Sequence, residues 1–222
     1  MIKAVIFDMD GILVDSEDFW QEEERVFFAS KGIDITPEMQ IETYGLGTYE
    51  VVKYWFHYKP WTDSEVDAGP IVHELYRRVG ERIRCEACPK PGIPAIFDFF
   101  YKRNIPAGLA TSSPYKMIDL VLNRLNLNDK FTVVHSCESE DYEKPHPAVY
   151  ISAAAKLGVE PSHCLVFEDS VIGMVAAVAA RMKTVVVPDA RHRDNPKYHL
   201  ADLMLGSLDE FSQKHFDRLN GK

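Results

Sequence analysis

Between residues 95 and 187 the sequence alternates short apolar runs with segments of helical periodicity, and this alternation restricts the possible folds more than any other feature. Helices are expected over residues 95–103, 114–125, 147–157 and 171–180, and strands over residues 106–110, 131–134, 164–167 and 184–187. Strands joined by helices pair in parallel, and the helices then cover both faces of the sheet. The sequence therefore predicts a doubly wound, mostly parallel, Rossmann-like α/β core.

One more strand is expected before this region, and a block of helices follows it. Residues 3–7 form a short apolar run that stops at acidic residues and glycine. After it the pattern is helical and shows no convincing strand, with helices expected over residues 16–31 with Ser16 as N-cap, from residue 36, and over residues 49–58 and 63–84 with Asp63 as N-cap.

The Pro- and Gly-containing segment 89–94 ends the helical block. Since the first strand precedes the block, the block interrupts the α/β region. We therefore expect an all-helical cap of residues 15–88, inserted into an α/β core formed by residues 1–14 and 89–222.

Acidic residues follow two of the predicted strands. Asp8 and Asp10 come directly after the first strand, and their i, i+2 spacing on an extended chain places both carboxylates on one side. Glu168 and Asp169 follow a later strand, and the carboxyl ends of parallel strands meet at the edge where ligands bind. Carboxylates gathered in a partly dry cleft repel one another, and their oxygen-only ligand set predicts Mg²⁺ at this edge.

Hydroxyl groups and one ammonium group are expected at the same edge. Thr111 and Ser112 follow a strand and precede the helix opened by Pro114, where hydroxyls and free backbone N–H groups can bind an anion. Lys144 supplies a cation before a proline. Each cluster alone is common in loops and helix caps. Together they predict a nucleophile, an anion site, a cation and metal ligands at one place.

The charge and the apolar pattern narrow the choice of partner. There are 25 basic and 34 acidic side chains, a net charge of −9, and no block of Lys and Arg, so no nucleic-acid partner is expected. No apolar run has the length of a membrane span, and the amino-terminal run is too short for a signal peptide. These features predict a cytoplasmic protein without a membrane partner, and reduced thiols at Cys85, Cys88, Cys137 and Cys164.

On these residues the sequence resembles the haloacid dehalogenase superfamily. Residues 5–11 resemble its first motif, Thr111 its second, Lys144 its third, and Glu168 with Asp169 its fourth. Within that superfamily, residues 108–114, 144–147 and 168–174 are similar to the bacterial sugar phosphatases that dephosphorylate hexitol phosphates and 2-deoxyglucose 6-phosphate, and β-phosphoglucomutase is the next neighbour.

The resemblance implies a mechanism and a set of roles. Asp8 would be the nucleophile that forms an aspartyl-phosphate, and Asp10 the general acid and base. Mg²⁺ would be held by Asp8, the backbone carbonyl of Asp10 and Asp169, with Glu168 as a further ligand or as a partner behind the ligands. The phosphate would be bound by Lys144, Thr111 and the N–H group of Ser112.

The substrate expected from the resemblance is a small phosphorylated metabolite, a sugar or sugar-alcohol phosphate, and the protein is expected to be a monomer or a weak homodimer. A cap over the substrate would set specificity and exclude water. Aromatic residues at helical spacing more often belong to a core than to a binding site, so the candidates for substrate contact have a structural alternative. These candidates are Trp20, Trp55 and His57.

Three alternatives stay open. A β-phosphoglucomutase needs a cap cation for a second phosphate, and residues 41–52 contain no Lys, Arg or His, although Arg77, Arg78 or Lys53 could substitute. A dehalogenase would leave Asp10 and Asp169 unexplained. A binding protein that has lost activity is disfavoured because the full set of site residues is present.

Overall fold

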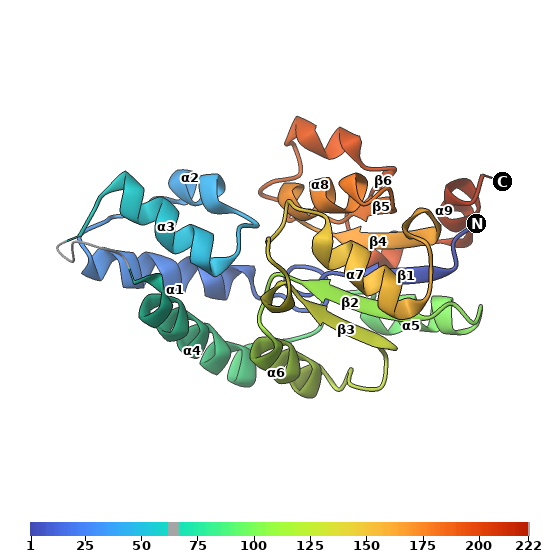
Figure 1. The fold of residues 1–222 in the computed structure, drawn as a ribbon, viewed down its shortest axis with the longest axis horizontal. Coiled ribbons are helices and arrows are strands. Elements are labelled where there is room, and N and C mark those ends of the chain that lie inside the picture. Colours follow the sequence, from blue (N-terminus) through green and yellow to red (C-terminus); the bar gives the residue numbers. More distant parts are fainter. Residues whose placement is uncertain (62–66, 222) are drawn as a thin grey trace.

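The computed structural model describes residues 1–61 and 67–221, and its centre is a six-stranded parallel sheet (Figure 1). The strand order is β3-β2-β1-β4-β5-β6, so the chain winds outward in both directions from β1. The predicted α/β core is confirmed. The strands are β1 Ala4–Phe7, β2 Ala107–Thr111, β3 Val133–Ser136, β4 Cys164–Glu168, β5 Lys183–Val186 and β6 Leu203–Met204.

Helices cover both faces of the sheet because the central strands are apolar on both sides. Along β1, Val5 and Phe7 point into one apolar cluster, while Ala4 and Ile6 point into another. The first cluster includes residues of α5 Ile93–Tyr101, α6 Tyr115–Leu125 and α9 Gln213–Leu219. The second includes residues of α7 Ala148–Leu157 and α8 Val171–Ala179.

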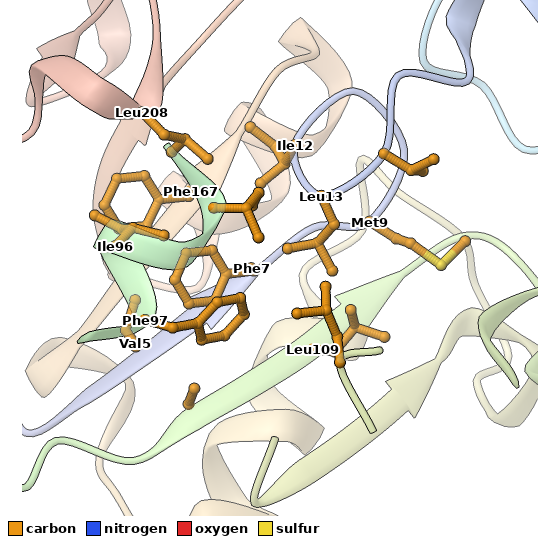
Figure 2. Packing of buried hydrophobic residues seen from close by; sticks show 14 of the residues in the cluster. Val5, Phe7, Met9, Ile12, Leu13, Ile96, Phe97, Leu109, Phe167 and Leu208 are labelled. Carbon is orange, nitrogen blue, oxygen red and sulfur yellow. The ribbon is translucent and has the colours of Figure 1, made fainter. Parts of the chain in front are cut away.

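Aromatic rings fill the larger cluster at the centre of the sheet. Phe7 pairs in register with Phe167 of β4, and their rings stack with centroids 5.2 Å apart (Figure 2). Phe97 and Phe100 of α5 pack against Phe7 at 5.1 and 6.3 Å. Rings of this size bury the most apolar area per residue. The packing fixes β1 beside β4, and so places the loops that follow these two strands next to each other.

A block of helices extends from one side of the sheet (Figure 1). Its residues 15–61 and 67–88 contain no strand, as predicted. It has a small core of its own in which Phe28 and Trp55 are fully buried. Its helices are α1 Glu17–Ser30, α2 Pro37–Gln40, α3 Thr48–Tyr58 and α4 Ala68–Glu86.

Several element boundaries differ from the sequence-based prediction. Helix α4 begins at Ala68 with the side chain of Asp67 as its cap, and the predicted cap Asp63 lies outside the described residues. The prediction did not include β6, which has only two residues, or α9. Both termini lie at the end of the molecule far from the cap, where the backbone N–H of Ile2 donates to Asn220 Oδ1 at 2.7 Å. None of the helices that the structure describes has the length and apolar composition needed to span a membrane.

The aromatic cluster predicts a large effect of Phe100→Ala. Phe100 is 1% exposed, and removing a buried phenyl ring costs about 3–5 kcal/mol in unfolding free energy. The neighbouring Tyr101 is 82% exposed, so Tyr101→Ala should change the stability by less than about 0.5 kcal/mol. Urea unfolding of both variants measures the difference. Equal losses of stability would contradict the packing described for α5.

Candidate active site

The loops that follow β1, β2 and β4 bring the predicted site residues together. Asp8 follows β1, Thr111 ends β2 and Glu168 ends β4, and these three strands are neighbours in the sheet. Lys144 comes from the loop before α7, a helix that packs against β1, β2 and β3. Each of these four residues is at most 7% exposed. The sheet topology thus produces one buried polar cluster from four separate sequence segments.

The ammonium group of Lys144 is the centre of this cluster. Its Nζ lies 2.8 Å from both Asp8 Oδ1 and Glu168 Oε1, 3.2 Å from the backbone oxygen of Ala110, and 3.0 Å from the hydroxyl of Tyr150. Burial alone would lower the pKa of Lys144, but the carboxylates of Asp8 and Glu168 raise it well above its usual value. Lys144 therefore stays charged and faces both acids.

Glu168 uses both of its carboxylate oxygens inside the protein. Oε1 accepts hydrogen bonds from Lys144 and from Tyr150. Oε2 accepts from the backbone N–H groups of Asp169 and Ser170, at 2.9 and 3.0 Å, and from the Ser170 hydroxyl. Burial works against ionisation of Glu168, but Lys144 and these donors lower its pKa below the usual value. Glu168 is therefore ionised, and its hydrogen bonds hold both Lys144 and the residues just before α8 in position.

Asp8 and Asp169 lie beside Glu168 in a cluster that could hold a metal ion. One oxygen of each of these three carboxylates lies within 4.8 Å of the others. Burial raises the pKa of Asp8 to about 7 against the lowering effect of Lys144, and burial together with Glu168 raises the pKa of Asp169 well above its usual value. The protein itself supplies too little positive charge for this cluster.

The donor set of the cluster fits a hard divalent cation. Asp8 uses Oδ1 for Lys144, and Asp169 uses Oδ2 to accept the hydroxyl of Tyr44 at 2.7 Å. One carboxylate oxygen on each residue is left for a cation. Oxygen-only ligands favour Mg²⁺ or a similar ion over zinc.

Asp10 is oriented by three donors from different elements. Its Oδ1 accepts the Ser16 hydroxyl at 2.5 Å and the indole N–H of Trp20 at 3.2 Å, and its Oδ2 accepts the Ser113 hydroxyl at 2.8 Å. Ser16 precedes α1 as predicted, but its side chain makes no capping hydrogen bond because the hydroxyl is used by Asp10. The Asp10 carboxylate is therefore held in one orientation toward the cavity.

The anion site predicted at the end of β2 also lies at this cavity. Thr111 is 2% exposed, and its Oγ1 accepts the backbone N–H of Ser113 at 3.2 Å. Ser112 lines the same cavity, just before α6 begins at Tyr115. A helix start offers free N–H groups and a positive dipole end to an anion.

Residues of the cap and the core together line a cavity of about 100 Å³ at this site. Core residues on its wall include Asp8, Asp10, Thr111, Ser112, Lys144 and Asp169. Cap residues on its wall include Glu17, Trp20, Glu24, Gln40, Tyr44 and Tyr76. Among the described residues that line the cavity, Lys144 is the only Lys or Arg.

Of the three predicted substrate contacts, only Trp20 lies on this cavity. Trp55 is 1% exposed and belongs to the cap core, where its ring packs against Phe28 at 6.3 Å. His57 is exposed, and its Nδ1 lies 2.7 Å from the backbone oxygen of Lys53. Both are on α3, whose cavity-facing residues include Val51. Trp55 lies one turn beyond Val51 on the same face of α3 and belongs to the cap core, whereas His57 lies on a different, exposed face.

The three cations suggested as a second phosphate site also lie elsewhere. Arg77 and Arg78 pair with Glu74 on α4 at 2.8 and 2.7 Å. Lys53 pairs with Glu50 on α3 at 3.1 Å. None of these three side chains is on the wall of the active-site cavity.

The structure adds residues that the sequence reasoning missed. Tyr44 reaches Asp169 from the loop before α3, and its ring lies against His192 with centroids 4.1 Å apart. Glu17 and Glu24 line the cavity from α1. Their i, i+7 spacing, with Trp20 between them, is a polar stripe on one helical face that the sequence could have revealed. No sequence signal pointed to Tyr44, because its role depends on the contact between cap and core.

The sequence pattern of haloacid dehalogenase-like hydrolases matches residues 5–187. The chain belongs to this family, and the resemblance noted in its motifs is confirmed.

Individual relatives make the position within the family more definite. The chain is 40% identical to hexitol phosphatase B of Escherichia coli K12, over 96% of both chains. It is 31% identical to the phosphorylated carbohydrates phosphatase of Thermotoga maritima, over 83% of this chain and 84% of the relative. A crystal structure of β-phosphoglucomutase from Clostridium difficile superposes with a TM-score of 0.86 at 26% identity, and covers 100% of this chain and 98% of the other.

The close approach of Gly11 to Asp169 predicts that Gly11→Ala disrupts the candidate metal site. A Cβ atom at Gly11 would lie 2.1 Å from Asp169 Oδ2, and the residue has φ +74°. We expect Mg²⁺ binding at least about tenfold weaker, measured by calorimetry, since displacing the surroundings of a ligand has effects of that size.

Gly158→Ala is the matched control. Gly158 has φ +70° but no atom within 4 Å of the added Cβ, so it shares the backbone strain of about 1–2 kcal/mol without the clash. If both variants bind Mg²⁺ equally well, Asp169 does not belong to the metal site.

Proposed function

We propose that the protein is a magnesium-dependent phosphatase that hydrolyses the phosphomonoester of a hexitol or a related sugar. The observation that carries this proposal is the arrangement of Asp8, Asp10 and Lys144 beside an anion site, in a chain 40% identical to hexitol phosphatase B over nearly its whole length. The wider similarity to a phosphorylated carbohydrates phosphatase supports the same substrate class.

In the first half-reaction Asp8 attacks the phosphorus atom. One carboxylate oxygen of Asp8 is the attacking atom, and Lys144, which donates to Oδ1 at 2.8 Å, holds the carboxylate in place. A bond forms between this oxygen and phosphorus, and the bond from phosphorus to the ester oxygen breaks. Asp10 gives a proton to the leaving alcohol, which departs as a neutral hydroxyl group. The product on the enzyme is an aspartyl-phosphate.

In the second half-reaction water hydrolyses the aspartyl-phosphate. Asp10 removes a proton from the attacking water, whose oxygen bonds to phosphorus while the bond to Asp8 breaks. The hydrogen bonds from Ser16 and Ser113 keep the Asp10 carboxylate in position for both transfers. Asp10 thus returns to its starting protonation state after each turnover.

The charge of the phosphoryl group is balanced by the surrounding residues. Lys144, the Thr111 hydroxyl and the N–H of Ser112 stabilise its oxygens. Mg²⁺ would supply further positive charge at a phosphoryl oxygen, held by Asp8, Asp169 and the backbone carbonyl of Asp10. Glu168 acts behind these ligands, since both of its oxygens already accept hydrogen bonds within the protein.

Residues 15–88 act as the cap that closes over the substrate. The cavity of about 100 Å³ lies between these residues and Asp8, Asp10 and Lys144 of the core. Closure then separates the reaction from bulk water.

A β-phosphoglucomutase is the second candidate, supported by the TM-score of 0.86 to that enzyme. Its chemistry moves a phosphoryl group between two positions of a sugar, so a second phosphate must be bound by the cap. The described lining of the cavity offers no Lys or Arg from the cap for that purpose. Hydrolysis fits the cavity better than transfer.

The proposal predicts metal-dependent release of inorganic phosphate. We expect turnover of at least one member of a panel of hexitol, hexose, deoxyhexose and pentose phosphates with Mg²⁺, and none after EDTA. β-Glucose 1-phosphate is assayed in parallel for conversion to the 6-phosphate. Conversion without phosphate release would replace the phosphatase by the mutase, and release that persists in EDTA would remove the metal from the proposal.

The nucleophile is tested by Asp8→Asn. We expect kcat to fall by at least about three orders of magnitude, as for other removed nucleophiles, while the thermal unfolding midpoint shows that the fold persists. Asp119→Asn, on the exposed face of α6, is the matched control and should retain the wild-type rate. Near-normal turnover by the Asp8 variant would refute the covalent mechanism.

A further inference from the structure

The cap side of the active-site cavity is polar, but it carries acids and amides instead of cations. Glu17, Gln21, Glu24 and Gln40 line it, and no Lys or Arg of the cap is found among the described lining residues. A second phosphate group in this space would face carboxyl groups without a counter-charge. A hydroxyl group would find both hydrogen-bond donors and acceptors. The cap side is therefore suited to an uncharged, hydroxyl-rich chain.

Most of these polar groups are already engaged with each other. Gln21 Nε2 donates to Glu17 Oε1 at 2.6 Å, and Gln40 Nε2 donates to the backbone oxygen of Gln21 at 2.7 Å. Gln21 Oε1 accepts from Arg191 at 3.1 Å. These contacts fix α1 and α2 relative to each other, so the polar side chains on the cap side are already ordered before a substrate binds.

Glu24 is the exception in this group. It is only 9% exposed, it lines the cavity, and within the described part of the chain its carboxyl group has neither a hydrogen bond nor an ion pair. Its carboxyl oxygens are not among the fully enclosed polar atoms that lack a partner within the described residues, so they are accessible from the cavity that Glu24 lines. A hydroxyl group of a substrate in this cavity can therefore supply the missing partner.

The environment of Glu24 selects the kind of partner. Burial, together with the charge of Glu17, raises the pKa of Glu24 to about 8, so the group holds its proton at neutral pH. A protonated carboxyl group donates one hydrogen bond and accepts others, which matches a hydroxyl group. It does not provide the positive charge that a phosphate requires.

We propose that Glu24 is a specificity-determining residue that hydrogen-bonds a hydroxyl group on the carbon chain of a monophosphorylated polyol, and that the cap surface around it rejects a second phosphate. The proposal rests on the proposed phosphatase function, and it adds that the cap recognises a hydroxyl group of the substrate. In this proposal Asp8 and Lys144 engage the phosphate from the core side of the cavity, and Glu24 engages the polyol chain from the cap side.

The test compares kcat/KM for a hexitol monophosphate, the corresponding hexitol bisphosphate and a short alkyl phosphate without hydroxyl groups. Glu24→Leu should lower kcat/KM for the hexitol monophosphate by about 10- to 100-fold and leave the alkyl phosphate within about twofold, because only the polyol reaches the cap surface. Glu24→Gln, which keeps a donor and an acceptor, should recover most of the loss. Glu24→Lys should reduce the ratio of kcat/KM for the hexitol monophosphate to kcat/KM for the bisphosphate by at least about tenfold.

Glu22→Leu is the matched control on the same helix. Glu22 is exposed and pairs with Arg82 at 2.9 Å, so this variant should keep the wild-type ratio of the three substrates. Equal losses by Glu24→Leu on the polyol and the alkyl phosphate would assign Glu24 a purely structural role and overturn the proposal. If Glu24→Leu leaves kcat/KM unchanged for both the polyol phosphate and the alkyl phosphate, the proposal is overturned as well.

Failure of the phosphatase function itself gives a different result. The wild-type protein would then release no phosphate from any of the three compounds. In that case calorimetric titration with the hexitol monophosphate decides the role of Glu24. Binding at least about tenfold weaker in Glu24→Leu than in the wild type and in Glu22→Leu supports the contact. Equal binding by all three proteins, or no binding to any of them, overturns it.

Discussion

The buried ammonium group of Lys144 is the interaction on which the rest of the site depends. It joins Asp8 after β1 to Glu168 at the end of β4, so it connects the loops of two neighbouring strands. Removing one partner from such a buried pair leaves an uncompensated charge, which is costly. The hydroxyl of Tyr150 on α7 also stabilises this pairing, because it hydrogen-bonds with both Lys144 and Glu168. The position of Asp8 is thus set by the packing of the whole sheet.

The charge balance of this cluster explains how an acidic protein can handle an anion. Lys144 pairs with Asp8 and Glu168, and burial, together with the neighbouring carboxylates, raises the pKa values of Asp8 and Asp169. A divalent cation would offset the negative charge of these carboxylates and add local positive charge for a phosphoryl group. The net charge of −9 therefore does not oppose phosphate binding, because the binding depends on the charges within the cavity.

The sequence revealed the core of the molecule better than its cap. Apolar runs followed by acids, hydroxyls or glycine identify strand ends, and the carboxyl ends of parallel strands necessarily converge, so Asp8 and Asp169 could be predicted. The cap depends on helical phase. Trp55 and Trp20 look alike in sequence, but one fills the cap core and the other contacts Asp10. The lack of a partner for Glu24 is a property of three-dimensional packing, which periodicity does not report.

Cap and core meet at Asp169, and this contact relates the two halves of the cavity. Tyr44 of the cap loop donates to Asp169 Oδ2, and its ring is held against His192 of the core. The other oxygen of Asp169 is left for a cation, so the cap contact and the proposed metal site use different oxygens of one carboxylate. Tyr44 and Glu24 line the same cavity, so the cap contact with Asp169 and the α1 face with Glu24 are present in one arrangement. In the proposed reaction, the polyol chain and the phosphate are bound in this one arrangement.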